Sequence, residues 1–176
     1  MTNYFELYNI PQTFHPDPAT VKTKYYELSR LYHPDRFATG GAENTAEPMR
    51  MAALNNDAYK TLKNQDTTMA YLLRLAGVLE DEEKYALPPA FLMEMMDLNE
   101  LVSELEDAPD NENARLQALN ALAEQLQAWD TATRTLTDQF DSSHPDTALL
   151  LQIKDMYFRR KYLLRIQERI DRFAAQ

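Results

Sequence analysis

The sequence predicts an all-α protein, and three observations support this fold class. Alanine, leucine, glutamate, glutamine and methionine abound, and these are residues that favour helices. Glycine occurs only three times, and the runs of β-branched and aromatic residues that mark strands are almost absent. Apolar residues instead recur every three or four positions over several segments, which is the spacing of amphipathic helices.

The first 77 residues are expected to form a domain built on a helical hairpin with short flanking helices. A short helix is expected over Tyr4–Asn9, and Asp17 with Pro18 supplies the N-cap and first turn of a second helix. The second helix runs to about Tyr32, because the residue before Pro34 avoids helical backbone. After a loop with glycines at 40–41, helices are expected from about 42 or 47 to 63 and over 67–76, and Gly77 is the C-cap of the last.

The chain changes character after residue 77. Residues 78–88 contain an acidic run that leads into a proline pair, Pro88-Pro89, and this composition is typical of a linker. Three long helices are expected beyond it, over about 89–107, 113–140 and from 143–145 to the end. Short connections favour antiparallel neighbours, so residues 89–176 are expected to form a three-helix bundle. The middle helix carries a seam spaced alternately by three and four: Leu119, Leu122, Leu126, Trp129, Thr133, Leu136 and Phe140.

Charge and composition exclude several classes of function. The net charge of −10 argues against nucleic acid as a partner, and the absence of cysteine excludes disulfides and thiolate metal sites. The N-terminus has no secretory signal and no segment has the roughly 20 apolar residues of a membrane span. We therefore expect a soluble cytoplasmic protein that uses no membrane, cofactor or metal. Residues 80–112 hold twelve acids and one base, whereas 154–172 hold seven bases and three acids, which suggests pairing between two helices.

The tripeptide His-Pro-Asp occurs three times and contains all three histidines. The copies at 15–17 and 144–146 stand where helices are expected to begin, so helix capping accounts for them. The copy at His33, Pro34 and Asp35 follows a helix instead. Lys22 and Arg30 lie outside the apolar stripe of that helix, and Arg36 follows the tripeptide. The result is a modest basic surface beside a histidine and an aspartate, which suits an acidic partner, although the histidine could simply offset the helix dipole.

The first 76 residues resemble a J-domain. The resemblance lies in Asn3-Tyr4-Phe5-Glu6-Leu7, in Leu31-Tyr32-His33-Pro34-Asp35-Arg36 and in Ala58-Tyr59-Lys60-Thr61-Leu62, in this order and spacing. The resemblance implies that this domain binds a DnaK-type ATPase chaperone and stimulates its ATP hydrolysis. The residues it assigns to this role are His33, Pro34 and Asp35, together with Lys22, Arg30 and Arg36. General J-domains often carry a basic pair where this chain has Tyr26 and Glu27, which points to a specialised chaperone.

The first bundle helix shows apolar residues on two faces. Its core stripe is expected to be Phe91, Met95, Leu98, Val102 and Leu105. Leu92, Met93 and Met96 fall away from this stripe, with Asp97, Glu100 and Glu104 beside them. Phe158, on the last helix, is likewise expected to point away from the core. A methionine-rich apolar patch with an acidic rim is typical of a protein-docking site, unless neighbouring helices cover these residues.

This second half resembles the HscB/Jac branch of J-proteins, which act in iron–sulfur cluster assembly. The stretch from Ala90 to Glu100 is similar to the client-binding helix of that branch, and Tyr71–Gly77 is similar to its junction after the J-domain. The resemblance implies an IscU-type scaffold protein as client and an HscA-type chaperone as partner. It assigns the hydrophobic client site to Leu92, Met93, Met96 and Phe158, with Asp97, Glu100 and Glu104 around it.

Two other functions fit parts of the sequence. A J-domain protein with a different client would share the His33 loop and differ at the patch on the first bundle helix. An enzyme or metal protein could use a His–Asp pair as a base and its orienting group. The wide separation of the three histidines along the expected fold, and the absence of an HExxH spacing, argue against the enzyme.

Overall fold

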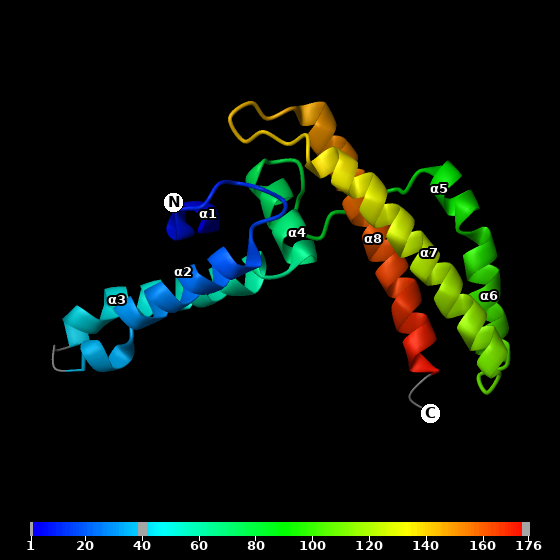
Figure 1. Cartoon of the computed structure of the whole chain (residues 1–176), viewed down its shortest axis with the longest axis horizontal. Coiled ribbons are helices and arrows are strands. Elements are labelled where there is room, and N and C mark those ends of the chain that lie inside the picture. The colour runs from blue at the N-terminus through cyan, green and yellow to red at the C-terminus, as the bar shows by residue number, and fades with distance from the viewer. Residues whose placement is uncertain (1, 39–41, 174–176) are drawn as a thin grey trace. The chain divides into compact units, whose positions relative to one another are not determined.

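The computed structural model describes residues 2–38 and 42–173, which form eight α-helices and one short 3₁₀ helix, with no strand among them (Figure 1). The described chain divides into two compact units, Met1–Gly77 with Asp141–Pro145, and Val78–Phe140 with Asp146–Gln176. The predicted all-α fold is confirmed. The elements in order are α1 (Tyr4–Tyr8), α2 (Pro18–Leu31), η1 (Pro34–Arg36), α3 (Ala42–Leu62), α4 (Gln65–Leu75), α5 (Pro89–Glu94), α6 (Met96–Asp107), α7 (Glu112–Thr137) and α8 (Thr147–Arg172).

In the first unit, α2 and α3 lie side by side as a helical hairpin (Figure 1). Buried Asn55 of α3 joins three helices: its side-chain oxygen accepts from the Tyr8 hydroxyl at 2.9 Å, and its amide donates to the Tyr25 carbonyl at 3.0 Å and to Ser29 at 3.1 Å. Tyr25 also stacks on Tyr59, with ring centroids 4.2 Å apart. A buried polar group that is fully hydrogen-bonded fixes one register, so α2 has one position along α3.

Helix ends in this unit follow the predicted capping residues. The Asp17 carboxylate accepts from the Thr20 N–H at 2.9 Å at the start of α2, and Pro18 is the first helical residue. The Thr20 hydroxyl also donates to this carboxylate, at 2.6 Å, and the two hydrogen bonds from Thr20 lower the pKa of Asp17 below its usual range. Gly77 follows α4 with φ +74°, the left-handed backbone that glycine adopts readily. The predicted glycine loop at 40–41 lies outside the described residues.

The second unit is a bundle of α5–α6, α7 and α8, in which α7 and α8 run side by side (Figure 1). All five predicted core residues of the first bundle helix are buried, but that helix is interrupted at Met95. The Asn99 backbone N–H and the Asn99 side-chain amide both donate to the Met95 carbonyl at 2.9 Å, at the start of α6.

The seam predicted on the middle helix is only partly correct. Leu122, Trp129 and Thr133 are buried, whereas the predicted Leu119, Leu126, Leu136 and Phe140 are only half-buried. The remaining core positions belong to Ala114, Ala118 and Thr137. The reason is that α7 contacts both α6 and α8, so its buried face is wider than a two-helix seam.

Residues 78–88, expected to be a linker, lie against α8 as part of the second unit. Leu79 is buried, and the ring of Tyr85 stacks on Phe158 with centroids 4.4 Å apart. The Tyr85 hydroxyl donates to Asp155 at 2.7 Å. Burial, and this hydrogen bond to a carboxylate, raise the pKa of Tyr85 to about 12. Residues 78–88, which we call the strap, are thus held along one side of α8.

No helix within 2–38 and 42–173 has both the length and the apolar character that a membrane crossing requires.

Candidate binding surfaces

The loop after α2 is the first candidate surface. Pro34–Arg36 forms the 3₁₀ helix η1, and the His33 Nδ1 caps it by accepting from the Asp35 N–H at 3.3 Å. With Nδ1 as acceptor, a neutral His33 ring carries its proton on Nε2. The side chains of His33 and Asp35 are 57% and 90% exposed. The loop therefore presents a ring N–H donor and a carboxylate acceptor to solvent.

Two of the predicted basic residues, Arg30 and Arg36, lie at this loop, whereas Lys22 lies near the start of α2. Lys22, Arg30 and Arg36 are all exposed. Arg36 donates to the Arg30 carbonyl at 3.2 Å, and a cation at this position satisfies a free carbonyl at the end of α2. Glu27 forms an ion pair with Lys24 at 3.1 Å, so the negative charge of Glu27 is partly neutralised. The structure thus brings the predicted chaperone-binding residues to α2 and the loop that follows it.

A groove beside the loop was not predicted from the sequence. It has a volume of about 440 Å³ and lies between the end of α2 and α3. Its apolar lining includes Pro34, Phe37, Pro48 and Met49, and Met49 is 65% exposed. The sequence feature that could have indicated this groove is Met49, an apolar residue outside the stripe of α3 that packs on α2. An apolar groove beside a charged loop adds contact area for a protein partner.

The second candidate surface is the off-core face of α5 and α6. Leu92, Met93 and Met96 are 42%, 70% and 64% exposed, although the adjacent Phe91 and Met95 are buried. The prediction that these three side chains lie off the core is confirmed. Single exposed apolar residues are common, but three within five positions make a contiguous patch.

Three carboxylates border this patch, as predicted. Asp97, Glu100 and Glu104 are exposed, and no cation of the described chain lies within ion-pair distance of them. Glu106, in contrast, faces α8 and pairs with Arg169 at 2.8 Å, and the hydrogen bond from this arginine lowers the Glu106 pKa. The rim acids therefore remain available to a partner. We call Leu92, Met93, Met96, Asp97, Glu100 and Glu104 the bundle patch.

Phe158 does not join the bundle patch as an exposed residue. It is only 9% exposed, because the strap covers it through the stacked ring of Tyr85. The prediction of an exposed anchor at this position is wrong. Helical phase placed Phe158 correctly outside the α7-facing core, but it could not show that a segment expected to be a linker packs there. An aromatic residue within the acidic run, Tyr85, was the sequence signal of that packing.

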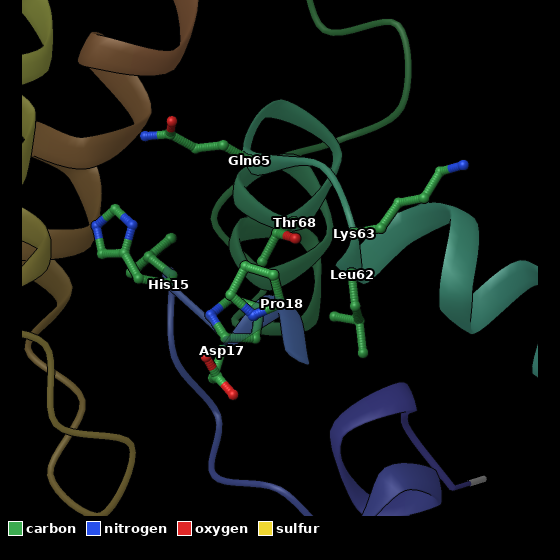
Figure 2. A pocket seen from close by; sticks show the side chains of 9 residues that line it. His15, Asp17, Pro18, Leu62, Lys63, Gln65 and Thr68 are labelled. Atoms are coloured by element: carbon green, nitrogen blue, oxygen red, sulfur yellow. The ribbon is translucent and has the colours of Figure 1, made fainter. Parts of the chain in front are cut away.

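The other two His-Pro-Asp copies serve as predicted at helix starts. Asp146 accepts from the N–H groups of Ala148 and Leu149 at the start of α8. Figure 2 shows the pocket at the start of α2, of about 470 Å³, where the side chains of His15 and Asp17 point in different directions. These two residues do not form a base with its orienting carboxylate. Within the described ranges, no three residues among His, Cys, Asp and Glu gather as metal ligands would.

Comparison with known proteins defines the class and the family. Residues 87–171 match the family model of the HSCB C-terminal oligomerisation domain. A Shewanella oneidensis protein named Co-chaperone protein HscB homolog is 30% identical over 172 residues, which cover 97% of this chain and 95% of that protein. A helical hairpin with an exposed His-Pro-Asp loop, joined to this type of bundle, defines a J-type co-chaperone rather than an enzyme. The chain belongs to the HscB family of co-chaperones.

Further relatives agree in fold as well as in sequence. A homologue from Photobacterium profundum is 37% identical over 113 residues, a match that spans 64% of this chain and 66% of that protein, slightly less than two thirds. The structure of chaperone HscB from Vibrio cholerae has a TM-score of 0.75 at 26% identity, with 99% of both chains covered. The human co-chaperone HscB has a TM-score of 0.78 at 26% identity, with 97% of this chain and 81% of that chain covered.

Proposed function

We propose that this chain stimulates the ATPase of a DnaK/HscA-type chaperone through residues 1–77. The strongest support is the His33 loop, which exposes a donor and a carboxylate next to Arg30 and Arg36, with Lys22 also exposed on α2. An acidic surface on the chaperone would pair with Lys22, Arg30 and Arg36, and Asp35 would meet a cation there. Charged contacts of this kind set the orientation and the rate of encounter.

The bundle, residues 89–176, is proposed to bind the client, an IscU-type iron–sulfur scaffold protein. Leu92, Met93 and Met96 would bury apolar area against the scaffold. Asp97, Glu100 and Glu104 would pair with basic residues of the scaffold at the rim. Methionine adapts to irregular surfaces, which suits a client that must later be released. Phe158 is not part of this proposal, because the strap covers it.

Both surfaces on one chain would couple client capture to ATP hydrolysis. A scaffold bound to the bundle is tethered to a chain that is itself docked on the chaperone, so its effective concentration at the chaperone rises without any new contact. The co-chaperone would thereby deliver the scaffold to the chaperone and promote the maturation of iron–sulfur proteins.

A pull-down from native extract with the full chain as bait tests this assignment. We expect one ATPase chaperone, retained in the presence of ATP, and the iron–sulfur scaffold. The variant His33→Gln should lose the chaperone and keep the scaffold. Recovery of a different client with an intact bundle patch would replace the scaffold in this proposal.

A further inference from the structure

A pocket of about 310 Å³ lies between the strap and α8, outside the bundle patch. Tyr85, Leu87 and Phe158 provide its apolar wall, and Lys84, Lys161 and Arg165 provide its charge. The rings of Tyr85 and Phe158 stack face to face, with an interplanar angle of 6°, and this stacking fixes the apolar wall. The three cations are exposed, so they can reach a ligand from solvent.

These three cations differ from their neighbours on α8. Lys154 pairs with Glu83, Arg159 pairs with Asp155 at 2.6 Å, and Arg169 pairs with Glu106 at 2.8 Å. Lys84, Lys161 and Arg165 have no carboxylate of the described chain within 4.0 Å; Lys161 instead lies 5.8 Å from the Phe158 ring centroid. Lys84, Lys161 and Arg165 are therefore cations that the described chain leaves available to a ligand.

The carboxylate in the pocket lining, and the one beneath Tyr85, are already paired. Glu83 lines the pocket, and its partner is Lys154. Asp155 holds both Arg159 and the Tyr85 hydroxyl, at 2.6 and 2.7 Å. The pocket therefore keeps a net positive charge within a protein of net charge −10. A ligand that matches it carries negative charge next to an apolar or aromatic group.

The pocket adjoins the bundle patch on the same unit. Leu87 precedes Pro88, and the Pro88 carbonyl accepts from the Leu92 N–H at 3.2 Å, so Leu92 lies one turn further along α5. On α8, Tyr162 lies between the two pocket cations in sequence. Its hydroxyl bonds the Asn99 amide at 2.7 Å, and its ring packs against Phe91 at 5.6 Å. The positive pocket and the bundle patch are thus neighbours on the same unit.

We propose that Lys84, Lys161 and Arg165 bind an acidic segment of the client protein, an inference that rests on the proposed client-binding role of the bundle. The client would place apolar residues on Leu92, Met93 and Met96. The client would meet the acids of the bundle patch at one border and the cations of the pocket at the other. Only one orientation of the client would then place each of its charges opposite a charge of the other sign. Opposed charges at the two borders would make the wrong orientation repulsive, which is how interfaces gain specificity.

Charge reversal tests the proposal with the IscU-type scaffold as probe. The double variant Lys161→Glu with Arg165→Glu should weaken scaffold binding about tenfold and flatten its dependence on salt. The neutral pair Lys161→Gln with Arg165→Gln should weaken it about threefold, with less disturbance of the packing on Phe158. The control, Arg115→Glu with Arg134→Glu on α7, has the same net charge and should bind like wild type. Equal affinities for control and pocket variants, with wild-type binding intact, would overturn this inference and leave the proposed function standing.

A second probe separates the pocket from the identity of the client. A hexaglutamate peptide titrated into the ¹⁵N-labelled chain should shift the backbone amides of residues 84, 161 and 165, and the double charge reversal should abolish these shifts. A scaffold that fails to bind the wild-type chain while the peptide shifts these amides would contradict the proposed client and support the acidic-segment site. Absence of any shift at these amides would overturn the site itself.

Discussion

The His33 loop and the bundle patch are both exposed, but different forces hold them. The loop is kept in place by a few polar contacts: the Asp35 N–H donates to His33 Nδ1, and Arg36 donates to the Arg30 carbonyl. The bundle patch stands on buried neighbours, since Phe91, Met95 and Leu98 fix the helices from which it projects. The loop depends on individual charged groups, whereas the patch depends on apolar area. Single substitutions should therefore act in an all-or-none manner on the loop and in a graded manner on the patch.

The largest expected effect is at the loop. His33→Gln should abolish stimulation of the chaperone ATPase, because glutamine cannot reproduce both the Nδ1 cap and the outward N–H of the ring. The matched control is His144→Gln, which changes the same tripeptide in a copy that only precedes a helix. Steady-state ATP hydrolysis at saturating co-chaperone measures both. Equal loss in the two variants would show that the position of the tripeptide does not matter.

The next effect is on stability and concerns the strap. Phe158→Ala should lower the free energy of unfolding of the bundle by about 3 kcal/mol, because it removes a buried ring from the stack with Tyr85. Urea denaturation followed by tryptophan fluorescence measures it, since Trp129 is the chain's single tryptophan and lies buried in the bundle. Leu92→Ala, at an exposed position, should cost less than about 0.5 kcal/mol. A change of that small size at Phe158 would mean that the ring is not packed as described.

The bundle patch should respond in graded steps. Leu92→Ala with Met96→Ala removes apolar area and should weaken scaffold binding about 30-fold, or about 2 kcal/mol. Each single variant should account for part of this loss. Leu116→Ala on α7 is the control, because Leu116 is 57% exposed but lies outside the patch. Calorimetric titration gives the affinities, and a control that weakens binding as much as the double variant would rule out a local patch.

The smallest effect concerns an ion pair that belongs to neither surface. The hydrogen bond from Arg169 lowers the Glu106 pKa, so this contribution to stability is present at neutral pH and is lost as the pH falls through the lowered pKa of the folded state. Glu106→Gln should cost about 0.5 kcal/mol at pH 7, since the pair is about a third exposed. Urea midpoints for variant and wild type should converge as the pH falls through the lowered Glu106 pKa. A difference that grows in acid would contradict this sign.

The sequence predicted features whose causes are local. Caps at Asp17 and Asp146, and the left-handed Gly77, follow from residue chemistry within one turn of a helix, and all three are present. The exposure of Leu92, Met93 and Met96 followed from the phase of one helix. The His33 loop and the bundle patch were therefore both identified from local sequence features.

Features that depend on contacts distant in sequence were missed. The covering of Phe158 requires Tyr85, 73 positions earlier, to pack on α8. The hydrogen bond from the Asn99 amide to the Tyr162 hydroxyl joins α6 to α8 across 63 positions. The apolar groove at Met49 forms only when α3 lies against the end of α2. Phase and spacing within one segment contain no information about such partners.

The central claim is that one chain must carry both surfaces, and a mixing experiment tests it most directly. Stimulation of the chaperone ATPase by scaffold plus wild-type chain is compared with stimulation by scaffold plus an equimolar mixture of His33→Gln and Leu92→Ala/Met96→Ala chains. The account predicts that the mixture falls well short of wild type at limiting scaffold, because neither chain can both tether the client and trigger hydrolysis. Full restoration by the mixture would contradict coupling through a single chain.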